Sequence, residues 1–243
     1  MKIYTFLLLA SFFCSTNVFG QEFNKKINKD SLLKIVITKL PEEKKKEFLK
    51  EYKKGNESTK EFLLFMLSMP TSSKKELIAN IDLNFEKINY LKTEYLKLVP
   101  KGYVVYIEFN PADNITMTKE NIDLKIEYVD GKEKKIIQEW NLEYNSPKLA
   151  QMLIPLKWTS TSINSIKQML SDANCISIEN SEITTIGFAR SGMGKYSFKL
   201  FNDSLTPEEI NEFNDGCTYI FYKKNIVLEY GGGAIGPQCF PKP

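Results

Sequence analysis

Few residues in this 243-residue chain have the types and spacing that catalysis requires. The sequence contains no histidine, which excludes catalysis by Ser-His-Asp or Cys-His groups and zinc binding through imidazole. Ser31 and Lys34 match the S-x-x-K spacing in which a lysine activates a serine, but the Ser-Asp-Asn and Lys-Thr-Gly sequences of such sites are absent. Helix capping by Ser31 explains the same pattern, so we assign no catalytic residue, no metal site and no cofactor.

The segment from Arg190 to Lys195 is the main candidate for ligand binding. Two cations flank Gly192 and Gly194, and the N–H groups of such a turn can face an anion. The segment is not a phosphate-binding P-loop, because no Gly-Lys-Ser or Gly-Lys-Thr sequence follows. The alternative is a hairpin turn in which Arg190 pairs with a carboxylate of a neighbouring strand, such as Glu108. Arg190 and Lys195 are therefore candidate anion-binding residues.

Carboxylates and aromatic residues leave two further possibilities open. Glu208 and Glu209 are adjacent at an expected helix start, where they favour the helix dipole rather than form a facing acid pair. Two acids brought together by the fold would still permit hydrolysis of a glycan. Trp140, Trp158 and the many tyrosines could line a sugar- or peptide-binding face, although aromatic residues on alternating strands favour the core.

The first twenty residues are typical of a secretory signal peptide. A positive start precedes the apolar run Ile3–Phe13, and small residues allow cleavage before Gln21. The run is shorter than the roughly 20 apolar residues that span a bilayer. We therefore expect export to the periplasm or medium of a Gram-negative bacterium with an AT-rich genome and no transmembrane segment after cleavage. Lipid attachment at Cys14 is the alternative, although bulky residues precede it.

Export changes how the cysteines are interpreted, because disulfides form in oxidising compartments. The mature chain contains Cys175, Cys217 and Cys239. We favour a Cys217–Cys239 disulfide, which would close the glycine-rich tail and stabilise the fold by roughly 3 kcal/mol. Cys175 then becomes a buried free thiol. A second anion-binding candidate, Gly231–Gly236, is better explained as the tail that this disulfide holds.

Residues 21–100 form the expected helical region, with about four helices. The last and longest, Ser73–Val99, has apolar residues at three- and four-residue steps, interrupted by Asn84. This seam could pair two chains as a coiled coil, but packing within the chain is favoured. Its apolar positions are Leu77, Ile81, Ile88, Leu91, Tyr95 and Leu98.

Residues 101–243 are expected to form a mainly antiparallel sheet with short helices, so the fold class is α+β. Tyr103–Phe109 is apolar on both faces except at Glu108, which is typical of a central strand. Asp130-Gly131 marks a hairpin whose return strand places Ile136 and Trp140 on one face with Leu142 and Tyr144. The signal peptide (1–20), helical region (21–100) and sheet domain (101–243) are the expected divisions.

The net charge of +3 is too small for a typical nucleic-acid-binding protein. The leading hypothesis is an exported, non-enzymatic protein that binds another protein or an envelope component. The alternatives are a carboxylate-dependent hydrolase that acts on a glycan and a structural homodimer through the 73–99 helix.

Overall fold

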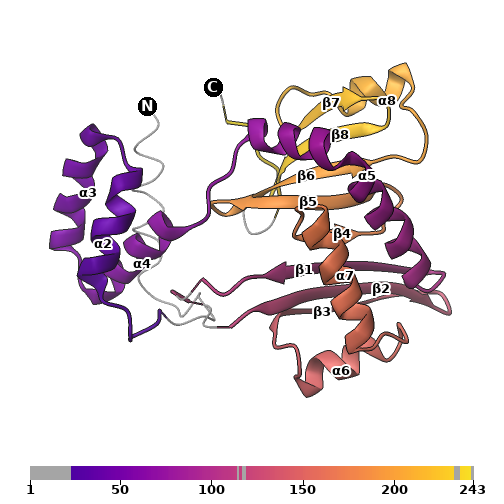
Figure 1. Cartoon of the computed structure of the whole chain (residues 1–243), viewed down its shortest axis with the longest axis horizontal. Coiled ribbons are helices and arrows are strands. Elements are labelled where there is room, and N and C mark those ends of the chain that lie inside the picture. The colour runs from indigo at the N-terminus through magenta and orange to yellow at the C-terminus, as the bar shows by residue number, and fades with distance from the viewer. Residues whose placement is uncertain (1–22, 114, 117–118, 233–235, 242–243) are drawn as a thin grey trace. The chain divides into compact units, whose positions relative to one another are not determined.

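The computed structural model describes residues 23–113, 115–116, 119–232 and 236–241 (Figure 1). The described residues form helices, mostly in the N-terminal part, and one antiparallel sheet, which confirms the α+β class. The helices are α2 (Lys29–Val36), α3 (Glu42–Lys54), α4 (Glu57–Ser68), α5 (Lys74–Leu98), α6 (Pro147–Leu153), α7 (Ser160–Asp172), α8 (Pro207–Glu212) and the 3₁₀ helix η1 (Ile37–Lys39). The expected signal peptide and Cys14 lie outside the described residues.

The chain divides into two compact units, and the division falls after Leu67. The first unit contains α2, η1, α3, α4 up to Leu67 and a short segment near Ile115. Its core is small, with Val36, Tyr52 and Leu64 buried. The second unit contains α5 and the sheet. This division differs from the expected one near Pro100, because α5 buries its apolar seam against strands rather than against the preceding helices.

Asparagine side chains cap two of the helices, and one of these caps differs from the one that the sequence suggested. The side chain of Asn28 accepts a hydrogen bond from the backbone N–H of Ser31 at 2.9 Å, so α2 begins at Lys29 and Ser31 is not its cap. The side chain of Asn56 likewise accepts from Thr59 and precedes α4. Asparagine is among the strongest N-cap residues, which explains why these two positions set the helix starts.

Helix α5 follows the predicted seam closely, and the side chain of Ser73 caps its N-terminus by accepting a hydrogen bond from the Glu76 backbone N–H. Its backbone leaves helical geometry at Asn84, where the apolar pattern is interrupted. The Asn84 side chain donates a hydrogen bond to Asn80 Oδ1 at 2.8 Å, and Asn80 Nδ2 donates to the carbonyl oxygens of Ala173 and Asn174. These bonds fix the kinked helix against the end of α7. Because the seam is buried within the chain, it is not available for a coiled coil.

The described residues form an eight-stranded sheet in the order β3-β2-β1-β4-β5-β6-β8-β7, with every pair antiparallel. The long hairpins β2–β3 and β5–β6 have their turns at the predicted glycines. The strands are β1 (Tyr103–Asn110), β2 (Asn121–Asp130), β3 (Glu133–Leu142), β4 (Ser177–Glu179), β5 (Thr184–Ser191), β6 (Gly194–Leu200), β7 (Tyr219–Lys223) and β8 (Ile226–Gly231).

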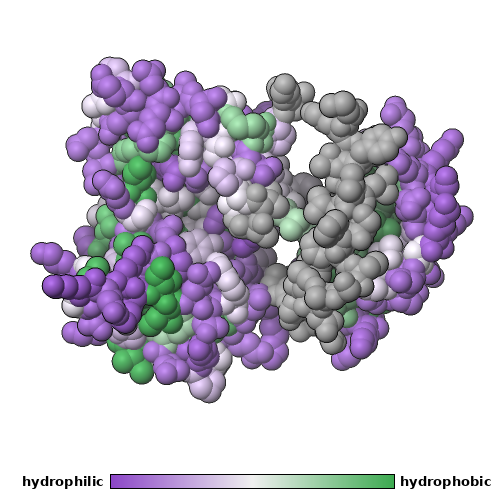
Figure 2. Space-filling model, turned by 180° about the vertical axis from the view of Figure 1, so that it is seen from behind, coloured by the Kyte–Doolittle hydropathy of each residue, from purple (hydrophilic) through white to green (hydrophobic). Residues whose placement is uncertain are grey.

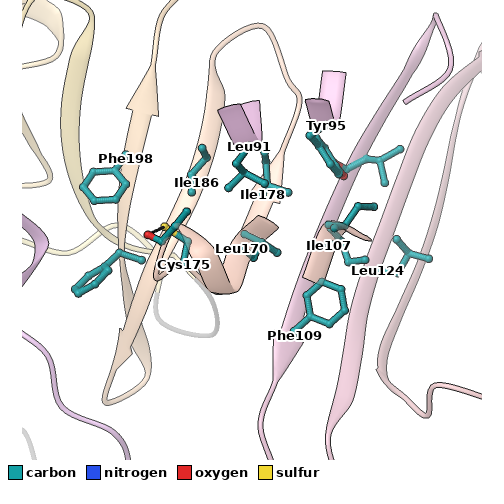
Figure 3. Close-up of a cluster of buried hydrophobic side chains, with 14 of the residues drawn as sticks. Leu91, Tyr95, Ile107, Phe109, Leu124, Leu170, Cys175, Ile178, Ile186 and Phe198 are labelled. Atoms are coloured by element: carbon teal, nitrogen blue, oxygen red, sulfur yellow. Dashed lines mark hydrogen bonds between the residues drawn. The ribbon is translucent and has the colours of Figure 1, made fainter. Parts of the chain in front are cut away.

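One face of the sheet carries the core. Figure 1 shows α5 and α7 on the same side of the strands. Figure 3 shows Leu91 and Tyr95 of α5 and Leu170 of α7 beside strand residues that include Ile107 and Ile178. The Tyr95 hydroxyl donates a hydrogen bond to the Val105 carbonyl at 2.9 Å, so this buried polar group is satisfied. We call the opposite side of the sheet the open face.

A β-bulge separates Trp140 from Leu142, so the prediction that these two residues share a face is wrong. The pairing of β2 with β3 shifts between Ile122 and Leu124, so two β3 residues oppose Asp123. Ile137 and Leu142 face the core, whereas Ile136 and Trp140 are 56% and 53% exposed. The sequence pattern assumed unbroken alternation, which a bulge interrupts. Trp158, in contrast, is buried as expected.

Cys175 is a buried free thiol, as predicted. Burial raises its pKa to about 12. Because the thiolate is the reactive form, we expect no labelling of the folded mature chain by a thiol-specific reagent such as DTNB at pH 8. After denaturation without reductant, one thiol per chain should react. Rapid labelling of the folded protein would contradict the burial of Cys175.

Candidate functional site

The charged residues that the sequence singled out meet at Glu108, on the open face near the middle of the sheet. Glu108 lies on β1, which has β2 on one side and β4 on the other, and its side chain is fully buried. Arg190 Nε donates a hydrogen bond to Glu108 Oε1 at 2.6 Å, which confirms the predicted pairing. Lys195 Nζ donates to Glu108 Oε2 at 3.0 Å, and the Tyr106 hydroxyl donates to the same oxygen.

Lys195 is held by three acceptors. Its ammonium group donates to Glu108, to the Tyr106 hydroxyl and to Ser177 Oγ, each at 3.0 Å. An ammonium group has three N–H donors, so this set uses all of them. A lysine that activates a serine must be neutral to accept its proton. The ion pair with Glu108 and the 1% exposure of Ser177 therefore favour a structural Ser177–Lys195 contact over a catalytic pair.

Gly187 provides the space for this cluster. It pairs with Ser177 across β4 and β5, and a Cβ atom at Gly187 would lie 2.1 Å from Ser177 Oγ and 3.0 Å from Lys195 Cδ. No side chain can be accommodated there unless its neighbours shift. Glycine inside a strand is a general sign of such close approach, and this signal was present in the sequence.

We expect Gly187→Ala to destabilise the sheet unit by about 2 kcal/mol, because the added methyl group overpacks the cluster. Denaturant unfolding followed by tryptophan fluorescence measures this effect, since both tryptophans lie in the sheet unit. Ser177→Ala removes the closest atom, so the double variant should lose less stability than the sum of the two single variants. Additive losses would show that the two residues are not coupled as the structure indicates.

Asp123 lies directly opposite Glu108 on β2. Burial raises the pKa of Asp123, although it accepts a hydrogen bond from the Asn141 backbone at 2.8 Å. Burial alone would also raise the pKa of Glu108, but Lys195 and Arg190 hold it below its ordinary value. Arg190 Nη2 lies 3.8 Å from Asp123 Oδ2, so one arginine spans both acids. We call Tyr106, Glu108, Asp123, Ser177, Arg190 and Lys195 the Glu108 cluster.

The two candidate anion-binding residues are thus brought together, with a carboxylate between them. Two acids and two bases balance within the cluster, which leaves little unpaired positive charge for an external anion. Gly192 forms the β5–β6 turn with φ of +59°, which is the hairpin alternative. The sequence indicated Glu108 because a single acid interrupted an apolar strand. Asp123 and Ser177 were missed because they come from other strands than Glu108, whereas Tyr106 lies on the same face of β1, two residues before Glu108.

The predicted disulfide between Cys217 and Cys239 is present. It holds the C-terminal tail, where Phe240 is buried against Tyr196 and Tyr230. The Phe240 backbone N–H donates to the Cys217 carbonyl at 2.8 Å. The glycine segment that was the second anion candidate lies partly outside the described residues.

A hollow of about 520 Å³ lies where α5 kinks beside the β7–β8 turn. Its acids, Asp82 and Glu86, both come from α5, so they do not face each other from opposite walls. Asp82 already accepts hydrogen bonds from Tyr222 and Lys223. A glycosidase needs two carboxyl groups that flank the scissile bond. The acids of this hollow do not provide that arrangement.

The open face has an exposed apolar group at the β2–β3 end. Val129, Ile136 and Trp140 are 68%, 56% and 53% exposed, and we call them the β2–β3 patch. Glu127 pairs with Ile136, and Val129 pairs with Lys134, so Val129 and Ile136 are diagonal neighbours. Figure 2, which shows this side of the molecule, has hydrophobic residues among hydrophilic ones over β1–β3.

No protein-family model, curated protein or solved structure matches this chain. Among the described residues, no helix has the length and apolar content needed to span a membrane.

Proposed function

We propose that this is an exported, non-enzymatic protein that binds another protein of the cell envelope or extracellular space through the β2–β3 patch. The observation that carries the proposal is the exposure of Ile136 and Trp140 on β3. Exposed tryptophan and aliphatic side chains surrounded by polar residues are typical of protein-binding surfaces.

The surroundings of the patch support recognition of a protein. Lys134 and Glu127 form an ion pair of 2.5 Å beside Ile136, and Lys125 bridges Glu127 and Glu179 at 3.0 Å to each. These paired charges offer both signs to a partner around an apolar centre. Tryptophan is enriched among the residues that dominate binding energies, so Trp140 is the expected anchor.

Capture of partners from an envelope extract tests the proposal. Immobilised mature protein should retain a partner that the Ile136→Ser/Trp140→Ser variant loses. Leu83→Ser is the matched control, because Leu83 is 82% exposed on α5, away from the patch. The control should retain the partner. Equal capture by all three proteins, or loss only with Leu83→Ser, would contradict a binding role of the patch.

Export is tested separately by cell fractionation. The full chain should appear outside the cytoplasm without residues 1–20, and a chain that lacks those residues from the start should stay inside. The support for export is the signal-like N-terminus and the Cys217–Cys239 disulfide, which is typical of oxidising compartments. Full-length protein retained in the cytoplasm would contradict this part of the proposal.

The hydrolase alternative rests on Glu108 and Asp123, whose pKa values shift in opposite directions, as in catalytic acid pairs. Against it, Glu108 is fully buried, and its oxygens accept bonds from Arg190 and Lys195. A substrate would have to displace these ion pairs before it reached the carboxylate. We therefore favour the binding role.

A further inference from the structure

The two edges of the sheet differ. At the β7 edge, the Tyr219 backbone N–H donates to Asp215 Oδ1 at 2.8 Å, and that of Phe221 donates to Asn214 Oδ1 at 3.1 Å. These side chains occupy the amides that would otherwise pair with another strand. At the β3 edge, no loop or side chain in the described part of the chain caps the backbone between Glu133 and Glu139. An uncapped edge strand of this length is a template for strand addition.

The side chains of β3 have a pattern that suits its own antiparallel copy. Lys135 and Glu139 pair with Tyr128 and Leu124, so both lie toward the helix side of the sheet. Lys134 and Trp140 lie on the open face. In antiparallel pairing about a two-fold axis through Ile137, each Lys135 meets a Glu139, and each Lys134 meets a Trp140.

Neighbouring registers lack this complementarity. An axis through Ile136 places Glu133 opposite Glu139, and an axis through Gln138 places Lys135 opposite Asn141. Like charges directly opposite destabilise a strand pair, whereas opposite charges stabilise it. Within one chain, Lys135 pairs with Glu133, which is 74% exposed, and Glu139 pairs with Lys148, which is 53% exposed. Because these partners are exposed, Lys135 and Glu139 can exchange them for each other across a dimer interface.

We propose that two copies of this chain pair through β3, in the register centred on Ile137, to form one continuous sheet. The pairing is an isologous contact, in which the same strand serves both copies. It brings the β2–β3 patches of the two copies together on one face, with Lys134 positioned over the partner's Trp140 for a cation–π contact. This inference rests on the uncapped edge of β3 and on its charged side chains, and it does not depend on the proposed function.

Sedimentation equilibrium of the mature chain, from about 1 µM to 500 µM, tests the proposal through charge reversal. The wild-type protein should form a dimer in this range. Lys135→Glu and Glu139→Lys should each weaken dimerisation at least tenfold, because each places two like-charge pairs in the interface. The double variant Lys135→Glu/Glu139→Lys should return to within about threefold of the wild-type constant.

The double variant distinguishes a loss of pairing between copies from a disturbance of contacts within a single chain. Within one chain, Glu139→Lys places a lysine beside Lys148, and Lys135→Glu does not relieve that contact. Recovery of dimerisation by the double variant is therefore expected only if Lys135 and Glu139 pair between copies. Glu133→Lys is the control and should dimerise as the wild type does. A monomer at all concentrations, single reversals without effect, or a double variant as weak as the single ones would overturn the proposal.

Discussion

Glu108→Gln should lower the free energy of unfolding of the sheet unit by about 3 kcal/mol at pH 7, the largest loss that we expect from a single neutral substitution in this cluster. The change removes the one carboxylate that contacts both Arg190 and Lys195, and leaves only Asp123, whose Oδ2 lies 3.8 Å from Arg190 Nη2. The expected value is at the lower end for buried ion pairs, because the Arg190 side chain is 34% exposed. Tryptophan fluorescence during urea unfolding measures the loss.

The stability difference between the wild-type protein and Glu108→Gln should depend on pH in a direction that the pKa of Glu108 determines. The pKa of Glu108 in the folded state lies below its ordinary value, so its contribution to stability is full above about pH 5 and is lost as the pH falls through the folded-state value. A protonated glutamate resembles glutamine. Wild-type and Glu108→Gln stabilities should therefore differ by a constant amount at neutral pH and converge as the pH falls through the folded-state pKa of Glu108.

Asp123→Asn and Glu133→Gln are the matched controls. The pKa of Asp123 is raised, so its ionised form costs stability above the folded-state value, and Asp123→Asn should be milder than Glu108→Gln. Glu133 is 74% exposed on β3, and its substitution should change stability by less than about 0.5 kcal/mol. A loss below about 0.5 kcal/mol with Glu108→Gln would show that the cluster does not stabilise the sheet.

Removal of the Cys217–Cys239 disulfide should cost about 3 kcal/mol, since the bond spans 22 residues. The variant Cys217→Ser/Cys239→Ser releases the tail that buries Phe240 against Tyr196. For a chain of this size, we expect a decrease in the melting temperature of roughly 6–12 °C, measured by thermal denaturation with fluorescence detection.

Reduction provides the control for the disulfide. A reductant should lower the melting temperature of the wild-type protein to that of the double variant and leave the double variant unchanged. Cys175→Ala should keep the full response to the reductant, because Cys175 is not part of the bond. A wild-type protein that is insensitive to the reductant would contradict a stabilising role of the tail.

The helices followed from the sequence because they depend on local patterns, and the charge pairing followed because the chain offers few partners for a buried acid. The α5 seam needs only steps of three and four residues. Glu108 was identified because one acid in an apolar strand requires a buried partner, and the chain has a single arginine, Arg190. The Cys217–Cys239 pairing followed from the flexible tail between the two cysteines.

The open face could not be predicted in the same way. A bulge adds one residue to one strand, so Trp140 and Leu142, which unbroken alternation places on one face, lie on opposite faces of the sheet. Gly187 lies against Ser177 because of the register between the consecutive strands β4 and β5, which the apolar pattern alone does not define. The boundary after Leu67 was missed because helix periodicity does not show which surface a helix buries.

Photo-crosslinking in living cells tests the binding claim most directly. A benzoylphenylalanine at position 140 should form a light-dependent adduct with a second protein, identified by mass spectrometry. The same residue at position 83 should form no such adduct. Crosslinking at position 83 alone, or the absence of any adduct with another protein at position 140, would contradict a binding role for the β2–β3 patch.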